Sequence, residues 1–285
     1  YFAEFQGFDR DISLAVREHY LPIGADSKTP KKPFSIALAL TDKIDTLVGF
    51  FGIDQKPTSS KDPFALRRLA LGIIRLLLEN NKELKLKDLI NYSYNLYLGQ
   101  DFELSNKTIY KDLNSFFIER LKNYMKEKDI RSDIIEAAIS SYGIDNMIKI
   151  YKKALTLNKL INKDTGQAVI SCYKRASNIL DQELKNPEFE LSNSTDPELF
   201  KNDFEKKLYK KIHDLHKYFA SINKDENYEL SLSNLAESKN TVFDFFDNVM
   251  VNDQNKAIKK NRLELLHMLR KTYENYLNFS EIESL

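Results

Sequence analysis

The spacing of apolar residues constrains this chain more than any other feature, because along most of it they recur every three or four positions and not every two. This interval places apolar side chains on one face of an α-helix. In 285 residues, only 8 glycines and 7 prolines interrupt the pattern. With 42% hydrophobic residues, the chain can form one large packed domain or two ordinary ones. The sequence therefore predicts an all-α fold.

Breaks in the apolar pattern divide the chain into separate helices. The segment "LPIGADSKTPKKP" ends the first one, because its prolines and glycine cannot continue a helix. The helices predicted from these breaks cover residues 8–20, 34–51, 63–80, 86–98, 105–126, 133–142, 147–160, 165–180, 196–221, 227–249 and 254–278.

Charge and cysteine content exclude several classes of protein. The 43 Lys and Arg against 42 Asp and Glu give a net charge of +1, so any attraction for a polyanion must come from local clusters. The single cysteine, Cys172, excludes an intramolecular disulfide and a multi-cysteine zinc site, and it fits a reducing compartment. No apolar run reaches the ~18 residues of a membrane span, so we expect no membrane association. Because the chain opens at Tyr1 in a segment that already looks helical, we expect it to be a piece of a longer protein.

The loop that ends in "SSKDPFALRR" holds a candidate anion site. Asp62 is a suitable N-cap, and Pro63 fits the first helical position, where its missing N–H costs nothing. Lys61, Arg67 and Arg68 would then surround a helix N-terminus, where free amides and the helix dipole favour a phosphate. The alternative is a solvated cap whose arginines pair with nearby acids.

The last predicted helix combines an apolar stripe with a cationic outer face. In "NKAIKKNRLELLHMLRK", six Lys and Arg accompany a single Glu264. Nucleic acid is the partner that such a face suggests, and a solvated face is the alternative. On the apolar side His267 is either packed or directed at RNA.

Signatures of catalysis are scarce. The sequence has no Gly-rich phosphate loop, no G-x-S-x-G and no H-E-x-x-H. His213 and His216 share a helix face, but their Lys-rich segment offers no third ligand, so a solvated or packed pair is favoured over a metal site. Asp42 and Asp45 are either a carboxylate pair or surface and capping groups, and spacing alone leaves both interpretations open.

Five segments of the chain resemble the β subunit of bacterial glycyl-tRNA synthetase. They occur in the family's order across the whole chain, which makes the match far more specific than one short motif. They are "REHYLP" (17–22), "LALTDKIDTLVGFFGIDQKPTSSKDPFALRR" (38–68), "YKRASNIL" (173–180), "FFDNVMV" (245–251) and "NRLELLHMLR" (261–270).

The resemblance implies a ligase of two kinds of chain, in a cytoplasmic α2β2 assembly. The α subunit would hold ATP and glycine, while the β subunit would recognise tRNA-Gly. This chain would be the C-terminal part of the β subunit, without catalysis or a cofactor of its own. The implied domains are the end of an HD-like helical domain (1–55), a helical linker region (56–164) and a helical-bundle, DALR-type anticodon-binding domain (165–285).

His19 and Asp42 fall where an HD hydrolase keeps its later metal ligands. However, no adjacent His-Asp pair precedes them, and the family is not a hydrolase. The resemblance therefore implies no catalytic metal here.

Two segments of the last implied domain offer side chains for RNA. Bases of an RNA loop stack on aromatic or guanidinium planes, and cations hold the backbone. Arg175 and Arg262 are favoured for their flat head groups with several donors. The competing interpretation is that both arginines bridge to acidic segments and hold the bundle together. The predicted tRNA-binding residues are Tyr173, Lys174, Arg175, Asn178, Asn252, Lys256, Lys259, Lys260, Asn261 and Arg262.

Two other classes of protein stay open beside the tRNA-binding subunit. One is a fragment of an HD-type metal-dependent phosphohydrolase, which metal analysis would identify. The other is a helical protein-interaction module that docks through Tyr- and Phe-rich faces, which salt-dependent RNA affinity would exclude.

Overall fold

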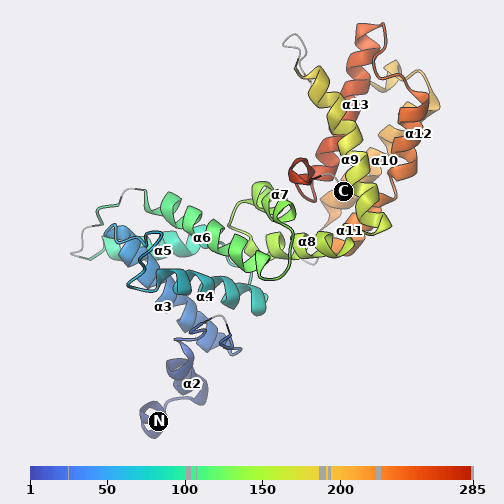
Figure 1. The fold of residues 1–285 in the computed structure, drawn as a ribbon. Coiled ribbons are helices and arrows are strands. Elements are labelled where there is room, and N and C mark those ends of the chain that lie inside the picture. Colours follow the sequence, from blue (N-terminus) through green and yellow to red (C-terminus); the bar gives the residue numbers. More distant parts are fainter. Residues whose placement is uncertain are drawn as a thin grey trace. The chain divides into compact units, whose positions relative to one another are not determined.

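The computed structural model describes residues 1–24, 26–100, 104–106, 108–185, 191, 194–222 and 226–283. Regular structure in these residues is helical throughout, as the apolar spacing predicts (Figure 1). None of the helices in these ranges is both long and apolar enough to cross a lipid bilayer.

The helices group into two compact units. Unit 1 comprises Tyr1–Asp129 and Tyr142–Tyr151, and unit 2 comprises Ile130–Ser141 and Lys152–Leu285. The division into three domains at residues 55 and 164 stays a prediction.

Unit 1 is built around α3 and α4. Helix α3 packs against α2, α4, α5 and α6, and the second half of α4 is buried on nearly all sides. Arg75 of α4 donates to the carbonyls of Gly24 and Ser27, both at 2.7 Å, and pairs with Glu79 at 2.6 Å. These bonds fasten the proline-rich loop to α4. The helices of unit 1 are α1 (Phe2–Phe5), α2 (Arg10–Glu18), α3 (Pro33–Gly52), α4 (Leu66–Glu79), α5 (Leu86–Leu98) and α6 (Ile109–Lys126).

Unit 2 is a bundle in which α13 packs against α9 and α10. The rings of Tyr173, Tyr273 and Phe279 form its aromatic core, with centroids 5.6 to 6.5 Å apart. Lys153, 1% exposed, donates to the carbonyls of Asn275 and Tyr276, which directly follow α13. Its elements are α7 (Ser132–Tyr142), the larger part of α8 (Met147–Leu160), α9 (Asp164–Glu183), η1 (Pro197–Leu199), α10 (Asp203–Ser221), α11 (Tyr228–Ala236), α12 (Lys239–Asn248), α13 (Lys256–Glu274) and η2 (Phe279–Glu281).

Most predicted helices are found, and α5 and α8 have the predicted bounds, but the single helix predicted over 227–249 is wrong. It is divided into α11 and α12 at Ser238. The buried Ser238 hydroxyl donates to the Leu235 carbonyl at 2.7 Å and lies 2.5 Å from the Tyr273 hydroxyl of α13. The break is therefore stabilised from another helix, which a local apolar pattern does not reveal.

The start of α4 is also corrected. The helix begins at Leu66 and not at Pro63, because Ala65 adopts a left-handed backbone conformation with φ 54°. Asp62 still caps the helix as predicted, but it does so from four residues before the first helical residue.

Candidate nucleic-acid interface

Helices α9 and α13 form the framework of the predicted RNA site. Tyr173 of α9 donates to Glu274 at the end of α13, while Glu183 at the end of α9 pairs with Lys259 near the start of α13. The two helices therefore run antiparallel. As a result, the predicted α9 residues lie beside the C-terminal half of α13, whereas the predicted cations of α13 lie at its other end.

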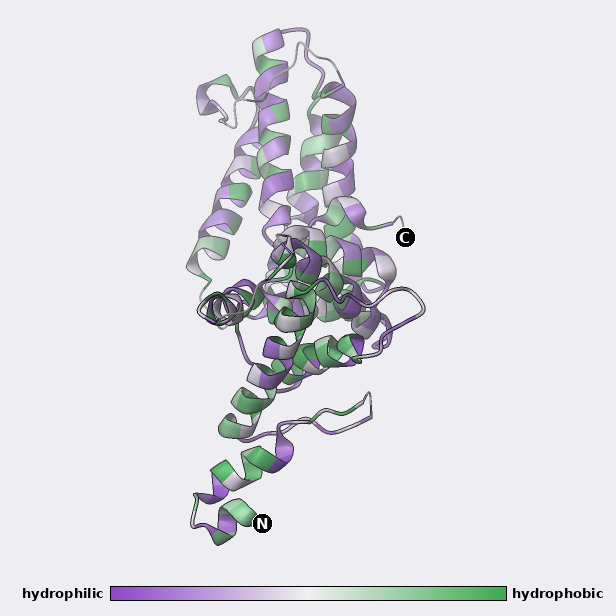
Figure 2. Cartoon of the chain, turned by 90° about the vertical axis from the view of Figure 1, so that its left-hand side faces the viewer, coloured by the Kyte–Doolittle hydropathy of each residue, from purple (hydrophilic) through white to green (hydrophobic). Residues whose placement is uncertain are grey.

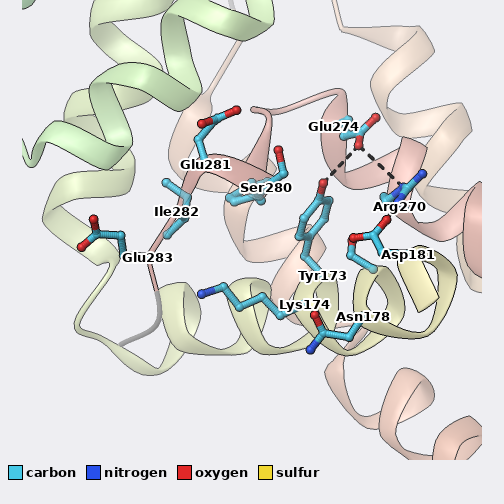
Figure 3. Close-up of a pocket in the computed structure, with 12 residues that line it drawn as sticks. Tyr173, Lys174, Asn178, Asp181, Arg270, Glu274, Ser280, Glu281, Ile282 and Glu283 are labelled. Carbon is cyan, nitrogen blue, oxygen red and sulfur yellow. Dashed lines mark hydrogen bonds and ion pairs between the residues drawn. The ribbon is translucent and has the colours of Figure 1, made fainter. Parts of the chain in front are cut away.

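A pocket of about 620 Å³ opens beside this helix pair (Figure 3). Side chains of α9, α13, η2 and the residues after η2 form its walls. Three predicted RNA contacts, Tyr173, Lys174 and Asn178, are among them. The full lining is Tyr173, Lys174, Ser177, Asn178, Asp181, Arg270, Glu274, Phe279, Ser280, Glu281, Ile282 and Glu283.

Paired groups hold several lining residues of the pocket in place. The Tyr173 hydroxyl donates to Glu274 Oε1 at 3.1 Å, and Lys271 donates to Glu274 Oε2 at 2.8 Å. Arg270 Nη1 lies 2.8 Å from Asp181 Oδ1. Burial, together with the nearby Glu274 carboxylate, raises the pKa of Tyr173 to about 12. Tyr173 thus remains a protonated donor at neutral pH, and its buried ring supports the wall and offers no face to a base.

Two exposed polar side chains of the pocket lining are available to a ligand. The exposed side chains of Asn178 and Glu281 make no hydrogen bond or ion pair within the part of the chain that the structure describes. Four carboxylates and two cations line the pocket, so a phosphate is disfavoured there. An amino group is favoured, because Asp and Glu accept hydrogen bonds from the amino edges of bases.

Arg175 and Arg262 both join helices to acidic residues. The Arg175 guanidinium lies 3.1 Å from Asp247 and within 5.0 Å of two ring centroids of α12. Arg262 is 5% exposed, with Nε 2.7 Å from Glu205 and Nη1 2.8 Å from Asp253. These contacts are those of the competing interpretation, in which both arginines hold the bundle together. An RNA contact by either stays a prediction.

The other predicted residues near the start of α13 divide into buried and exposed groups. Asn261 is buried and exchanges two hydrogen bonds with the backbone of Asp196, at 2.7 and 2.9 Å. Lys259 is half-buried against Glu183 at 2.7 Å. The remaining three, Asn252, Lys256 and Lys260, are exposed. Among the predicted residues of this segment, the exposed cations are therefore Lys256 and Lys260.

The loop before α4 places its cations around a helix start that already holds an anion. The Asp62 carboxylate accepts the backbone N–H groups of Leu66 at 2.8 Å and Arg67 at 3.0 Å. The Arg67 guanidinium turns back to the same loop, while Lys61 and Arg68 are exposed. Asp62 thus occupies the position predicted for a phosphate, and phosphate binding by the three cations stays a prediction.

Two of the groups considered for a metal, Asp45 and His19, have other partners. Asp45 accepts from the hydroxyls of Tyr97 at 3.1 Å and Ser93 at 3.3 Å, and His19 Nδ1 lies 2.7 Å from the Val16 carbonyl. In the described ranges, no three His, Cys, Asp or Glu side chains gather as metal ligands would.

Sequence reasoning missed the acidic half of the pocket. Asp181, Glu274 and Glu281 were not predicted, because a search for RNA contacts favours cations and aromatic rings. No local sequence pattern indicates them, because it is the antiparallel packing of α9 and α13 that brings Asp181 beside Arg270, 89 residues away.

Comparisons with known proteins agree with this arrangement. A family model described as glycyl-tRNA synthetase beta subunit matches residues 1–140, and a DALR anticodon binding domain model matches residues 169–285. Two similar proteins, each named as a glycine–tRNA ligase beta subunit, come from Cereibacter sphaeroides (37% identity) and Paracoccus denitrificans (34%). Both alignments cover 99% of this chain, which spans 41% and 40% of these relatives. With this agreement along nearly its whole length, the chain belongs to the glycyl-tRNA synthetase β-subunit family.

Proposed function

We propose that this chain is the tRNA-recognition part of the β subunit of a glycine–tRNA ligase. It would support the ATP-dependent attachment of glycine to tRNA-Gly, with the catalytic site on a separate α subunit. The observation that carries the proposal is the DALR anticodon-binding match over residues 169–285, because the same residues contain the pocket between α9, α13 and η2. The names of the relatives support the ligase reaction.

The pocket is suited to read a cytosine. Glycine codons begin with two guanines, so the anticodons of tRNA-Gly carry two cytosines. The N4 amino group of cytosine donates to Asp or Glu in protein complexes. The Glu281 carboxylate has no partner among the residues that the structure describes, and the Asn178 amide can donate to an acceptor on the same base. We assign the amino group to Glu281 and the ring acceptor to Asn178.

The test measures the affinity of this chain for tRNA-Gly and for the same tRNA with its anticodon replaced. We expect a preference for tRNA-Gly that Glu281→Gln reduces by about tenfold or more, since one good base contact contributes ~1–3 kcal/mol. Glu229→Gln, which removes an exposed acid from α11, is the matched control and should keep the preference. An unchanged preference in Glu281→Gln would remove this residue from the site.

Binding to the RNA backbone alone would not depend on the anticodon. Lys256→Gln and Lys260→Gln remove exposed cations of α13. We expect each to weaken binding of both tRNAs equally and to reduce the salt slope by about 0.7, as for one single-strand phosphate contact. If the native protein shows no anticodon preference at all, anticodon recognition by this chain is excluded, and only binding to the RNA backbone remains.

The proposal includes an α subunit in an α2β2 assembly in the cytoplasm, with ATP held by that subunit and no cofactor in this chain. Large apolar side chains are exposed in unit 1, and Figure 2 shows hydrophobic residues in close succession on its first helices. Such surfaces are typical of protein–protein contacts. The test is aminoacylation of tRNA-Gly by the full β chain with and without the α subunit. Activity of the β chain alone would overturn this assignment.

A further inference from the structure

Helix α10 carries cations along its exposed face. At about 100° per residue, Lys206, Lys210 and Lys217 fall within an arc of about 40°, and His213 lies at its edge. All four side chains are exposed. The buried side of the helix, roughly opposite, consists of Glu205, Leu208, Ile212 and Leu215.

These lysines are only weakly neutralised. Lys206 lies 3.4 Å from Asp203, and both side chains are more than 60% exposed, so water screens the pair. Lys210 and Lys217 make no ion pair within the described part of the chain. With a rise of about 1.5 Å per residue, the three lysines span about 16 Å, the length of about five stacked nucleotides.

A row of rings lies beside the lysines. The Tyr209 ring centroid is 5.4 Å from that of Phe200 and 4.5 Å from that of His213, which meets it edge-on at 79°. Phe200 and Tyr209 are half-buried and His213 is exposed, so each keeps part of a ring accessible. This packing gives His213 of the "HDLH" motif a role without a metal, because its ring belongs to the aromatic row.

Cations beside accessible rings are the combination that single-stranded RNA requires. The lysines hold phosphates, and the rings stack against bases without reading their identity. An acidic protein could form ion pairs with the lysines, but the ring faces would contribute little to its binding. We propose that this face of α10 is a second RNA-contact surface, which binds a single-stranded segment by its backbone and by stacking. The proposal rests on the proposed function only in taking RNA as the partner.

The test uses the whole chain and a short single-stranded oligoribonucleotide, with affinity measured over a series of salt concentrations. The triple variant Lys206→Gln/Lys210→Gln/Lys217→Gln should flatten the slope of log affinity against log salt by about 2, at ~0.7 per phosphate. Tyr209→Leu should weaken binding about tenfold with an unchanged slope, because stacking carries no charge. Tyr209→Phe should restore the affinity.

A matched control removes three exposed lysines from unit 1, as Lys82→Gln/Lys85→Gln/Lys111→Gln. It changes the net charge equally and should leave the slope unchanged. Equal flattening by both triple variants, no binding by the native chain, or full affinity in Tyr209→Leu would each overturn the α10 surface. Circular dichroism and the unfolding midpoint establish that each variant is folded.

The two proposals fail separately. If the anticodon preference is absent but the α10 variants still flatten the salt slope, the proposed function fails and the α10 surface stands. If the preference is present and the α10 variants change nothing, only the α10 surface fails.

Discussion

The two units bury charge in the same way but expose different surfaces. In unit 1, Arg75 joins α4 to a loop and to Glu79, and in unit 2, Arg262 joins α13 to Glu205 and Asp253. From Tyr1 to Leu98 large apolar side chains are often exposed. The described residues of unit 2 expose only Leu184, Leu230 and Met250. An arginine on a helix can therefore be buried in an ion pair that stabilises the core. Binding surfaces must then be formed by side chains that remain exposed.

The strongest test of this comparison is Arg262→Met. The substitution leaves Glu205, which is 0% exposed, without its cation, and a broken buried pair costs about 3–5 kcal/mol. Chemical denaturation should show this loss in the free energy of unfolding. A variant of native stability that loses affinity for every tRNA would instead make Arg262 an RNA contact and break the comparison.

Arg75→Met should have a smaller effect in unit 1. The side chain of Glu79 is 30% exposed and can be hydrated, so the main loss is that of the hydrogen bonds to the Gly24 and Ser27 carbonyls. We expect about 2 kcal/mol, within the range for hydrogen bonds to a charged group. A loss as large as that of Arg262→Met would show that exposure of the partner does not distinguish the two pairs.

Acid should reveal the Glu79 contribution. Burial alone would raise the pKa of Glu79, but the hydrogen bonds from Arg75 and Thr29 outweigh burial and lower its pKa below 4.5. Its stabilising contribution is therefore present above pH 4.5 and is lost as the pH falls through the folded-state pKa. The midpoint of urea unfolding should change less between about pH 6 and about pH 3 in Glu79→Gln than in the native protein. An unchanged difference would assign acid sensitivity to other carboxylates.

The smallest effect is expected on the exposed apolar surface. Tyr92 and Leu96 of α5 are 71% and 51% exposed. Tyr92→Ser and Leu96→Ser should each change the free energy of unfolding by less than about 0.5 kcal/mol, as surface substitutions usually do. Thermal denaturation of the two variants checks this expectation. A loss of several kcal/mol would place these side chains in the core of unit 1.

Much of the fold could be predicted because helix-forming patterns are local. Leu86–Leu98 and Met147–Leu160 were predicted to the residue from apolar spacing and breaks. The division at Ser238 could not be predicted, because the Tyr273 hydroxyl that binds it is 35 residues away. Tyr173, Lys174 and Asn178 come from one short motif of the sequence. Glu274, which binds Tyr173, and Glu281, which lines the same pocket, are brought there only by the packing of distant elements.

The sequence by itself determined the class of fold, the family and the position of most helices. These follow from residue types at fixed local spacing, where each helix needs only its own apolar stripe and caps. The tertiary structure alone decided which cations are available. Arg262 and Asn261 follow exposed Lys260 on the same helix, yet they face the core and form bonds there. The reason is that a helix turns about 100° per residue, so neighbours in sequence face different surroundings, and only packing determines which of them meet solvent.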